Sequence, residues 1–95
     1  RRDASEVHEA AAFHTLVRKE RQRSERTNEP FSLVVFENDA GASPALPFKR
    51  LERELLERVR ELDEIGWYDE RRIGVLLPHT AADGAESLAE DIQAT

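Results

Sequence analysis

The sequence has no cysteine, and it has no apolar run close to the roughly 20 residues that a membrane-spanning helix needs. Without cysteine, disulfides, thiolate nucleophiles and cysteine-based zinc sites are excluded, and a reducing compartment is permitted. The first residues, Arg1-Arg2-Asp3, are charged and lack the pattern of a signal peptide. These features predict a cytoplasmic protein that does not insert directly into a membrane.

Length and net charge further limit the number of domains and the kinds of partner that this protein can have. The chain has 95 residues, which predicts a single domain over 1–95 with one modest core. Its formal net charge is −6, whereas a general nucleic-acid binder needs a basic face to neutralise phosphates, so no nucleic-acid partner is expected. Because the sequence lacks an initiator methionine, we expect the domain to be a fragment of a longer protein.

One segment departs from this acidic balance. It contains five cations, at Arg18, Lys19, Arg21, Arg23 and Arg26. Two glutamates alternate with them, and alternating charge is the usual pattern of a solvated helix face. We therefore expect this run to be exposed surface.

The spacing of apolar residues predicts three helices and three strands. They are a helix over 4–26, a strand over 31–36, a helix over 48–62, strands over 65–68 and 73–77 joined by a turn at 69–72, and a helix over 85–92. Val7 belongs to the stripe of the first helix and Leu62 to that of the second, while Thr80 with Asp83 predicts a capping box. This order predicts an α+β fold, an α/β sandwich with a ferredoxin-like βαββα core and an N-terminal helix.

The ferredoxin-like topology places the strand at 31–36 beside the strand at 73–77. The final strand of that topology is missing from the predicted elements, so the strand at 31–36 becomes a very apolar sheet edge. We expect this edge to be covered by a continuation of the natural protein, by the N-terminal helix or by a partner chain.

Several stretches resemble the GGDEF (diguanylate cyclase-like) family. Residues 20–26, with the strand at 31–36, are similar to the family's E-x-x-R-S/A-x-R helix end and first strand. Residues 60–80 are similar to R-x-x-D, then the signature position, then a strand ending in L-P-x-T. The helix at 85–92 resembles the family's A-x-x-L-A-E-x-I helix. Order and spacing together carry the resemblance, which implies a nucleotide cyclase-like fold.

The resemblance also locates the family's GG[DE]EF signature, five residues after Asp63. Its positions hold Asp69, Glu70, Arg71, Arg72 and Ile73. In the family the two glycines let the backbone approach the nucleotide, and here both positions carry charged side chains. The family's third position is a carboxylate that helps to hold Mg²⁺, and here it is a cation, Arg71. We therefore expect a degenerate domain that is not an enzyme and has no catalytic residues or cofactor.

The end of the strand at 31–36 offers one weak candidate for a metal ligand. By position, Glu37 and Asp39 correspond to the family's D-x-D, whose leading carboxylate binds metal. A single carboxylate on a loop usually stays solvated, so no metal site is expected. The family's guanine-contacting Gly-His-x-x-Gly-Asp segment is absent between Asp39 and Arg60.

Arg60 and Asp63 match the family's R-x-x-D inhibitory motif, which binds cyclic di-GMP. An arginine can fork onto a phosphate or a guanine edge, and an aspartate can accept from a guanine amino group. Simple electrostatics at a helix end explain the same pair equally well. Both interpretations stay open at this point.

The leading hypothesis is a non-catalytic regulatory or interaction module of a bacterial signalling or exopolysaccharide-related protein. Its partner is expected to be another protein or a neighbouring domain. Two alternatives stay open. One is a cyclic di-GMP receptor that uses Arg60 and Asp63, and the other is a simple homodimerisation domain, including one fused to a sugar transferase.

Overall fold

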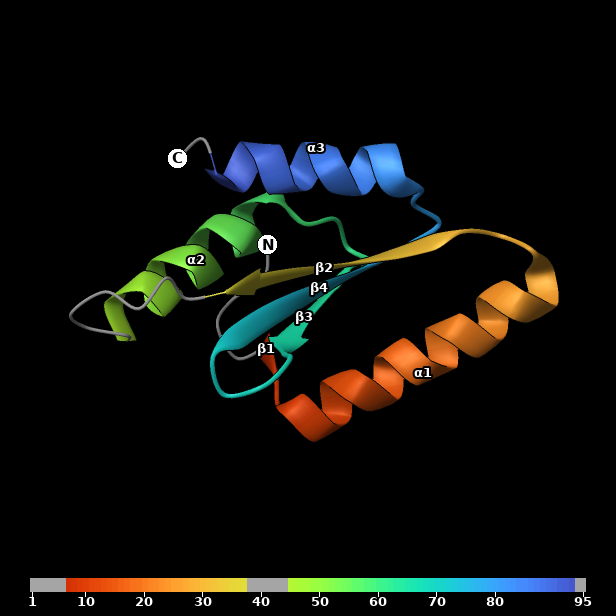
Figure 1. Cartoon of the computed structure of the whole chain (residues 1–95), viewed down its shortest axis with the longest axis horizontal. Helices are drawn as coiled ribbons and strands as arrows, with labels where there is room; N and C mark the ends of the chain where they lie inside the picture. Colours follow the sequence, from red (N-terminus) through yellow and green to blue (C-terminus); the bar gives the residue numbers. More distant parts are fainter. Residues whose placement is uncertain (1–6, 38–44, 94–95) are drawn as a thin grey trace.

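The computed structural model describes residues 7–37 and 45–93, which form one sheet with helices on both faces (Figure 1). The strands are β1 (Val7–His8), β2 (Phe31–Glu37), β3 (Glu64–Trp67) and β4 (Arg72–Pro78). The helices are α1 (Ala10–Thr27), α2 (Ala45–Arg58) and α3 (Ala82–Gln93). The predicted α+β fold is confirmed.

The sheet has the strand order β1-β3-β4-β2. β2 and β4 are antiparallel over seven residue pairs, from Phe31 opposite Pro78 to Glu37 opposite Arg72. This pairing confirms that the strand predicted at 31–36 lies beside the one predicted at 73–77. Within the described residues β2 forms one edge of the sheet and β1 forms the other.

β1 corrects the predicted start of the first helix. Val7 and His8 are extended and pair in parallel with Ile65 and Gly66 of β3, and α1 begins only at Ala10. Helical spacing of Val7 with later apolar residues was misleading, because a β-branched valine also suits a strand and β3 offers an edge with open backbone groups. His8 adds a side-chain contact, since its Nε2 lies 2.8 Å from Glu64 Oε1.

The two faces of the sheet are covered by different helices, as Figure 1 shows. The core beneath α2 and α3 contains six buried residues, which are Leu55, Ile65, Ile73, Val75, Leu77 and Ile92. The core beneath α1 is smaller and contains Phe13, Val17 and Leu76. The N-terminal helix therefore covers a face of the sheet. This face includes β2, because Phe31 and Leu33 pack with Phe13 and Val17 of α1.

Phe13 is the point of closest approach between α1 and the sheet. Its side chain is fully buried and lies on Gly66 and Gly74, which are opposite each other on β3 and β4. A Cβ atom at Gly66 would lie 2.5 Å from Phe13 Cδ1, and one at Gly74 would lie 2.6 Å from Phe13 Cε2. Any side chain at either position would collide with the ring, so these two glycines set the distance between helix and sheet.

Two predicted helix limits are wrong, and a side-chain hydrogen bond lies at each of them. α2 ends at Arg58 rather than at residue 62, and Leu62 is 67% exposed instead of packing in the stripe. The chain turns here because Asp63 Oδ2 accepts the backbone N–H of Arg60, which competes with continued helix. α3 begins at Ala82, so Thr80 precedes the cap position and its hydroxyl is used elsewhere.

No helix in the described ranges 7–37 and 45–93 is both long enough and apolar enough to cross a membrane.

The close approach of Phe13 predicts the effect of adding a methyl group to the sheet. We expect Gly74→Ala to lower the free energy of unfolding by about 1–3 kcal/mol, because overpacking forces the ring or the helix to move. Urea denaturation measures the change. In a Phe13→Leu background the cost of Gly74→Ala should shrink, because leucine lacks the end of the ring. An equal cost in both backgrounds contradicts this role of Gly74.

Candidate functional site

Arg60 and Asp63 form a turn between α2 and β3. Asp63 is only 2% exposed, although it is a charged residue. Its Oδ2 accepts the backbone N–H of Arg60 at 2.9 Å, and its Oδ1 lies 3.2 Å from Nη2 of the Arg60 guanidinium. Both carboxylate oxygens thus have a donor, which a buried charge requires. The sequence-predicted pair is brought together by the fold.

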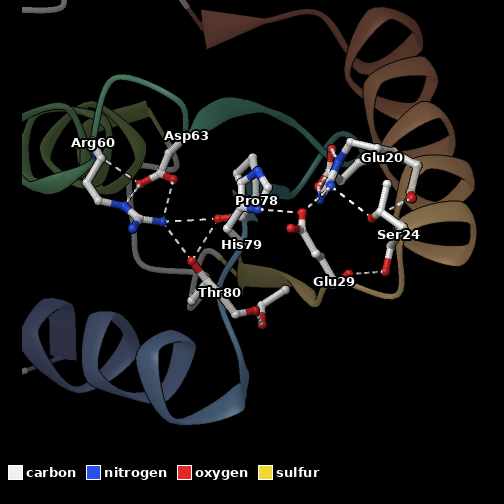
Figure 2. A network of polar contacts seen from close by, with 11 residues as sticks. Glu20, Ser24, Glu29, Arg60, Asp63, Pro78, His79 and Thr80 are labelled. Carbon is white, nitrogen blue, oxygen red and sulfur yellow. Dashed lines mark hydrogen bonds and ion pairs between the residues drawn. The ribbon is translucent and has the colours of Figure 1, made fainter.

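The same guanidinium reaches the end of β4, as Figure 2 shows. Arg60 Nη2 donates to the Thr80 hydroxyl at 2.6 Å and to the Pro78 carbonyl at 3.3 Å. The Thr80 hydroxyl in turn donates to the Pro78 carbonyl at 3.0 Å. We call Arg60, Asp63, Pro78 and Thr80 the Arg60 cluster. It ties the connection between α2 and β3 to the connection between β4 and α3.

A hollow of about 340 Å³ opens beside the Arg60 cluster. Its lining residues are Arg58, Val59, Arg60, Asp63, Leu77, Thr80, Gly84, Leu88 and Asp91. The side chain of Arg60 is 61% exposed and borders this hollow, whereas that of Asp63 is 3% exposed. A phosphate or a guanine edge that enters the hollow would compete with Asp63, Pro78 and Thr80 for the same guanidinium hydrogens.

Residues 69–73 form the tip of the β3–β4 hairpin and the start of β4, with the turn itself at 68–71. Asp69 Oδ1 accepts the backbone N–H of Arg71 at 2.9 Å. Asp69 Oδ2 accepts from Arg72 Nε at 2.8 Å and from Arg72 Nη2 at 2.6 Å. The Arg72 guanidinium also lies 4.9 Å from the centroid of the Tyr68 ring, which is cation–π distance. The tip of the hairpin is closed by its own side chains.

Glu37 lies directly opposite Arg72 in the register of β2 and β4. The pKa of Asp69 is lowered, first by the hydrogen bond from the Arg72 side chain and then by the backbone N–H of Arg71. The pKa of Arg72 is raised, chiefly by its hydrogen bond to Asp69 and to a smaller extent by the charge of Glu37. Arg72 thus forms a salt bridge with Asp69 and lies across the strand pair from the charge of Glu37.

Sequence reasoning missed a second polar network, which Figure 2 shows beside the Arg60 cluster. Arg23 pairs with Glu20 and, at 3.0 Å, with Glu29, whose Oε1 also lies 3.0 Å from His79 Nδ1. His79 follows Pro78 and has a positive φ of 56°. This network joins the end of α1 to the end of β4. Glu29 and His79 are 50 positions apart, so no local pattern in the sequence signals their contact.

Two solved diguanylate cyclases have a similar architecture. A DGC (diguanylate cyclase) protein from Thermotoga maritima superposes with a TM-score of 0.82 and 20% identity, over 92% of this chain and 68% of that protein. The diguanylate cyclase SiaD from Pseudomonas aeruginosa, solved in complex with its activator SiaC, superposes with a TM-score of 0.74 and 21% identity, over 96% of this chain.

The chain has a GGDEF-like fold. It spans only 39% of the Pseudomonas chain, and at these identities the likeness concerns the fold. No protein-family model matches the sequence, and no curated protein matches it.

The residues at the GGDEF-like hairpin do not fit the Mg²⁺ ion that this family's chemistry uses. By the resemblance of the sequence, Arg71 falls at the position of the metal carboxylate, and in the structure Arg72 pairs with Asp69 and lies opposite Glu37. A guanidinium in this place repels a divalent cation. In the described part of the chain no group of three or more His, Asp or Glu residues is arranged to hold a metal ion. Asp39, the other member of the D-x-D positions, lies outside the described residues.

The burial of Asp63 predicts a structural role for the R-x-x-D pair. We expect Asp63→Ala to lower the free energy of unfolding by about 1–3 kcal/mol, because the N–H groups of Arg60 and the turn lose their acceptor. We expect Arg60→Gln to cost less than about 1 kcal/mol, because the guanidinium is mostly exposed. Urea denaturation compares the two. Glu86→Ala on the exposed side of α3 is the control, and an Asp63→Ala protein as stable as this control contradicts the role.

The hydrogen bond between Arg72 and Asp69 predicts a pH dependence. The Asp69 carboxyl should titrate below its ordinary pKa of about 3.9 in an NMR pH titration, and Arg72→Gln should raise that pKa. A lowered pKa in the folded state means that this contact stabilises the fold above the unfolded-state pKa and that the stabilisation is lost as pH falls through the folded-state pKa. Arg71→Gln is the matched control, because Arg71 acts through its backbone N–H. An equal shift in both variants contradicts the assignment.

Proposed function

We propose that this chain is a non-catalytic GGDEF-like module that acts through contacts with another protein or with a neighbouring domain. The observation that carries the proposal is the position of Arg72, which pairs with Asp69 and lies opposite Glu37 at the signature hairpin. Phosphoryl transfer depends on positioned phosphates and on a metal that neutralises their charge. Charged residues occupy the positions of the two glycines, and two arginines lie beside the carboxylates. We therefore expect neither positioned phosphates nor a bound metal ion.

Contact with a protein partner fits what is known of a neighbour in fold. SiaD was solved in complex with its activator SiaC, so this fold is compatible with a bound regulatory protein. The analogy rests on the fold alone. Within residues 7–37 and 45–93 no three His, Asp or Glu side chains are arranged to hold a metal ion, which favours action through surfaces rather than through a reaction centre. A bacterial signalling or exopolysaccharide-related protein is the setting that we propose for such a module.

Binding of cyclic di-GMP by Arg60 and Asp63 is the second proposal. The hollow beside Arg60 and the exposure of its guanidinium favour it. The contacts of that guanidinium with Asp63, Pro78 and Thr80 weigh against it, because a ligand must replace them to gain the same hydrogen bonds. The protein-contact proposal therefore comes first.

The proposal predicts that the 95-residue chain does not convert GTP to cyclic di-GMP in the presence of Mg²⁺ or Mn²⁺. Chromatographic detection of the product during a long incubation measures this, with an active diguanylate cyclase assayed in parallel. Robust formation of cyclic di-GMP overturns the proposal. Glu37→Gln is the control for trace product, because turnover by a contaminating enzyme is unaffected by this change.

Calorimetric titration of the same chain with cyclic di-GMP separates the two proposals. Saturable heat that disappears in Arg60→Gln assigns a receptor function to the Arg60 cluster. No heat at high micromolar ligand removes the receptor proposal and leaves the protein-contact proposal in place.

A further inference from the structure

The second half of α1 has a positive net charge, whereas the rest of the chain has a negative one. Phe13 and Val17 are the buried residues of α1, and none of residues 18–27 is buried. Figure 1 shows this half of the helix running out past the strands to the turn that leads into β2. Residues 18–27 contain five cations and two anions, a net charge of +3. Because the whole chain carries −6, the remaining residues together carry −9.

The five cations in residues 18–27 differ in their surroundings. Arg23 is half-buried and pairs with Glu20 and Glu29 on the side of the helix that faces the body. The other four cations are exposed and make no ion pair within the described residues, and we call them the basic stripe: Arg18, Lys19, Arg21 and Arg26. With about 3.6 residues per turn, they lie on the outer side of the helix, away from the half-buried Glu20, Arg23 and Ser24. Exposed Glu25 lies on the same side between Arg18 and Arg21, so this side has four cations and one anion.

α3 carries the opposite pattern on the other face of the sheet. It has no lysine or arginine, and its four carboxylates are all exposed, forming the acidic stripe: Asp83, Glu86, Glu90 and Asp91. Its inner side is apolar, since Ala85 and Leu88 pack on the core and Ile92 is buried in it. Each stripe extends over nine residues, which corresponds to about 12 Å of helix. Asp91 also lines the hollow together with Arg58 at the end of α2.

The two stripes cannot meet within one molecule, because the sheet separates α1 from α3 (Figure 1). We propose that they meet between two copies of this chain, so that the basic stripe on α1 of one copy docks on the acidic stripe on α3 of the next. The match of charge sign and length supports a second copy as the occupant. The contact is heterologous and leaves one stripe of each kind open at the ends, so it predicts head-to-tail association rather than a closed two-fold dimer.

This inference does not depend on the proposed lack of catalysis, and it names the partner surface that a protein-contact module requires. Exposed ion pairs are weak singly and are screened by salt, so the association should be weak and sensitive to ionic strength. Formation of cyclic di-GMP in the GTP assay would not contradict this contact. A chain that stays monomeric would not change the result of the GTP assay.

Sedimentation velocity over a range of protein concentrations tests the proposal. The sedimentation coefficient of the 95-residue chain should rise with concentration at about 20 mM salt and should become constant at about 1 M salt, where the Debye length is only about 3 Å. A chain that stays monomeric at low salt, or an association that salt does not weaken, overturns the proposal.

Charge reversal identifies the two surfaces. Arg18→Glu with Arg21→Glu, and separately Glu86→Lys with Glu90→Lys, should each weaken self-association at low salt by at least about tenfold, because two attractions become repulsions. A mixture of the two doubly substituted proteins should associate again, since the reversed stripes are complementary to each other. Failure of the mixture to associate contradicts the pairing of α1 with α3.

The matched control lies on α2. Arg50→Glu with Arg53→Glu has the same spacing and the same charge change as the α1 variant, on exposed residues outside both stripes. Self-association of this variant should match that of the unsubstituted chain, and equal weakening shows a general charge effect that overturns the proposal.

Binding to vesicles that contain anionic lipid is the last measurement. Binding that needs Arg18 and Arg21 while the chain stays monomeric assigns the basic stripe to a membrane surface and overturns docking between copies.

Discussion

The contact of Phe13 with Gly66 and Gly74 is the constraint on which the arrangement of the other elements depends. An aromatic ring that lies directly on two opposed glycines holds α1 closer to the sheet than a pair with side chains would permit. That closeness places the residues before α1 beside β3, where Val7 and His8 pair as β1. It also anchors only the first half of α1, and the charged second half is left to extend past the sheet. The location of the basic stripe therefore follows from a packing contact at the other end of the helix.

Polar residues that resemble a reaction centre serve the scaffold in this chain. The Arg60 cluster joins the end of α2 to the end of β4, and the salt bridge of Asp69 with Arg72 closes the hairpin between β3 and β4. Both groups stand where the resemblance to GGDEF proteins implies nucleotide or metal contacts. Once each carboxylate has an arginine of its own chain as partner, a metal ion must compete with a cation that is already in place. These contacts tie the connections of the fold together and close its hairpin.

The sequence predicted those features that depend on local patterns. The apolar run from Phe31 to Phe36 predicted β2, and the two short apolar runs on either side of the charged turn at 69–72 predicted the hairpin. Val7 and Leu62 were misassigned because helical spacing says nothing about where a helix ends. Val7 pairs with the edge of β3 instead of continuing α1, and the turn between Arg60 and Asp63 leaves Leu62 exposed. The R-x-x-D pair was visible in the sequence, whereas its partners Pro78 and Thr80 were not, since 15 or more positions separate them from the pair.

The sequence by itself determined the α+β class, the charged composition of the hairpin at residues 69–72 and the concentration of cations at residues 18–26, because each is a matter of residue type and spacing along the chain. Only the tertiary structure decided that α1 covers a second face of the sheet, that Arg72 lies opposite Glu37, and that the basic and acidic stripes are on opposite sides of the molecule. These features depend on which elements pack together. Packing is governed by long-range contacts, such as that of Phe13 with the two glycines, which periodicity does not encode.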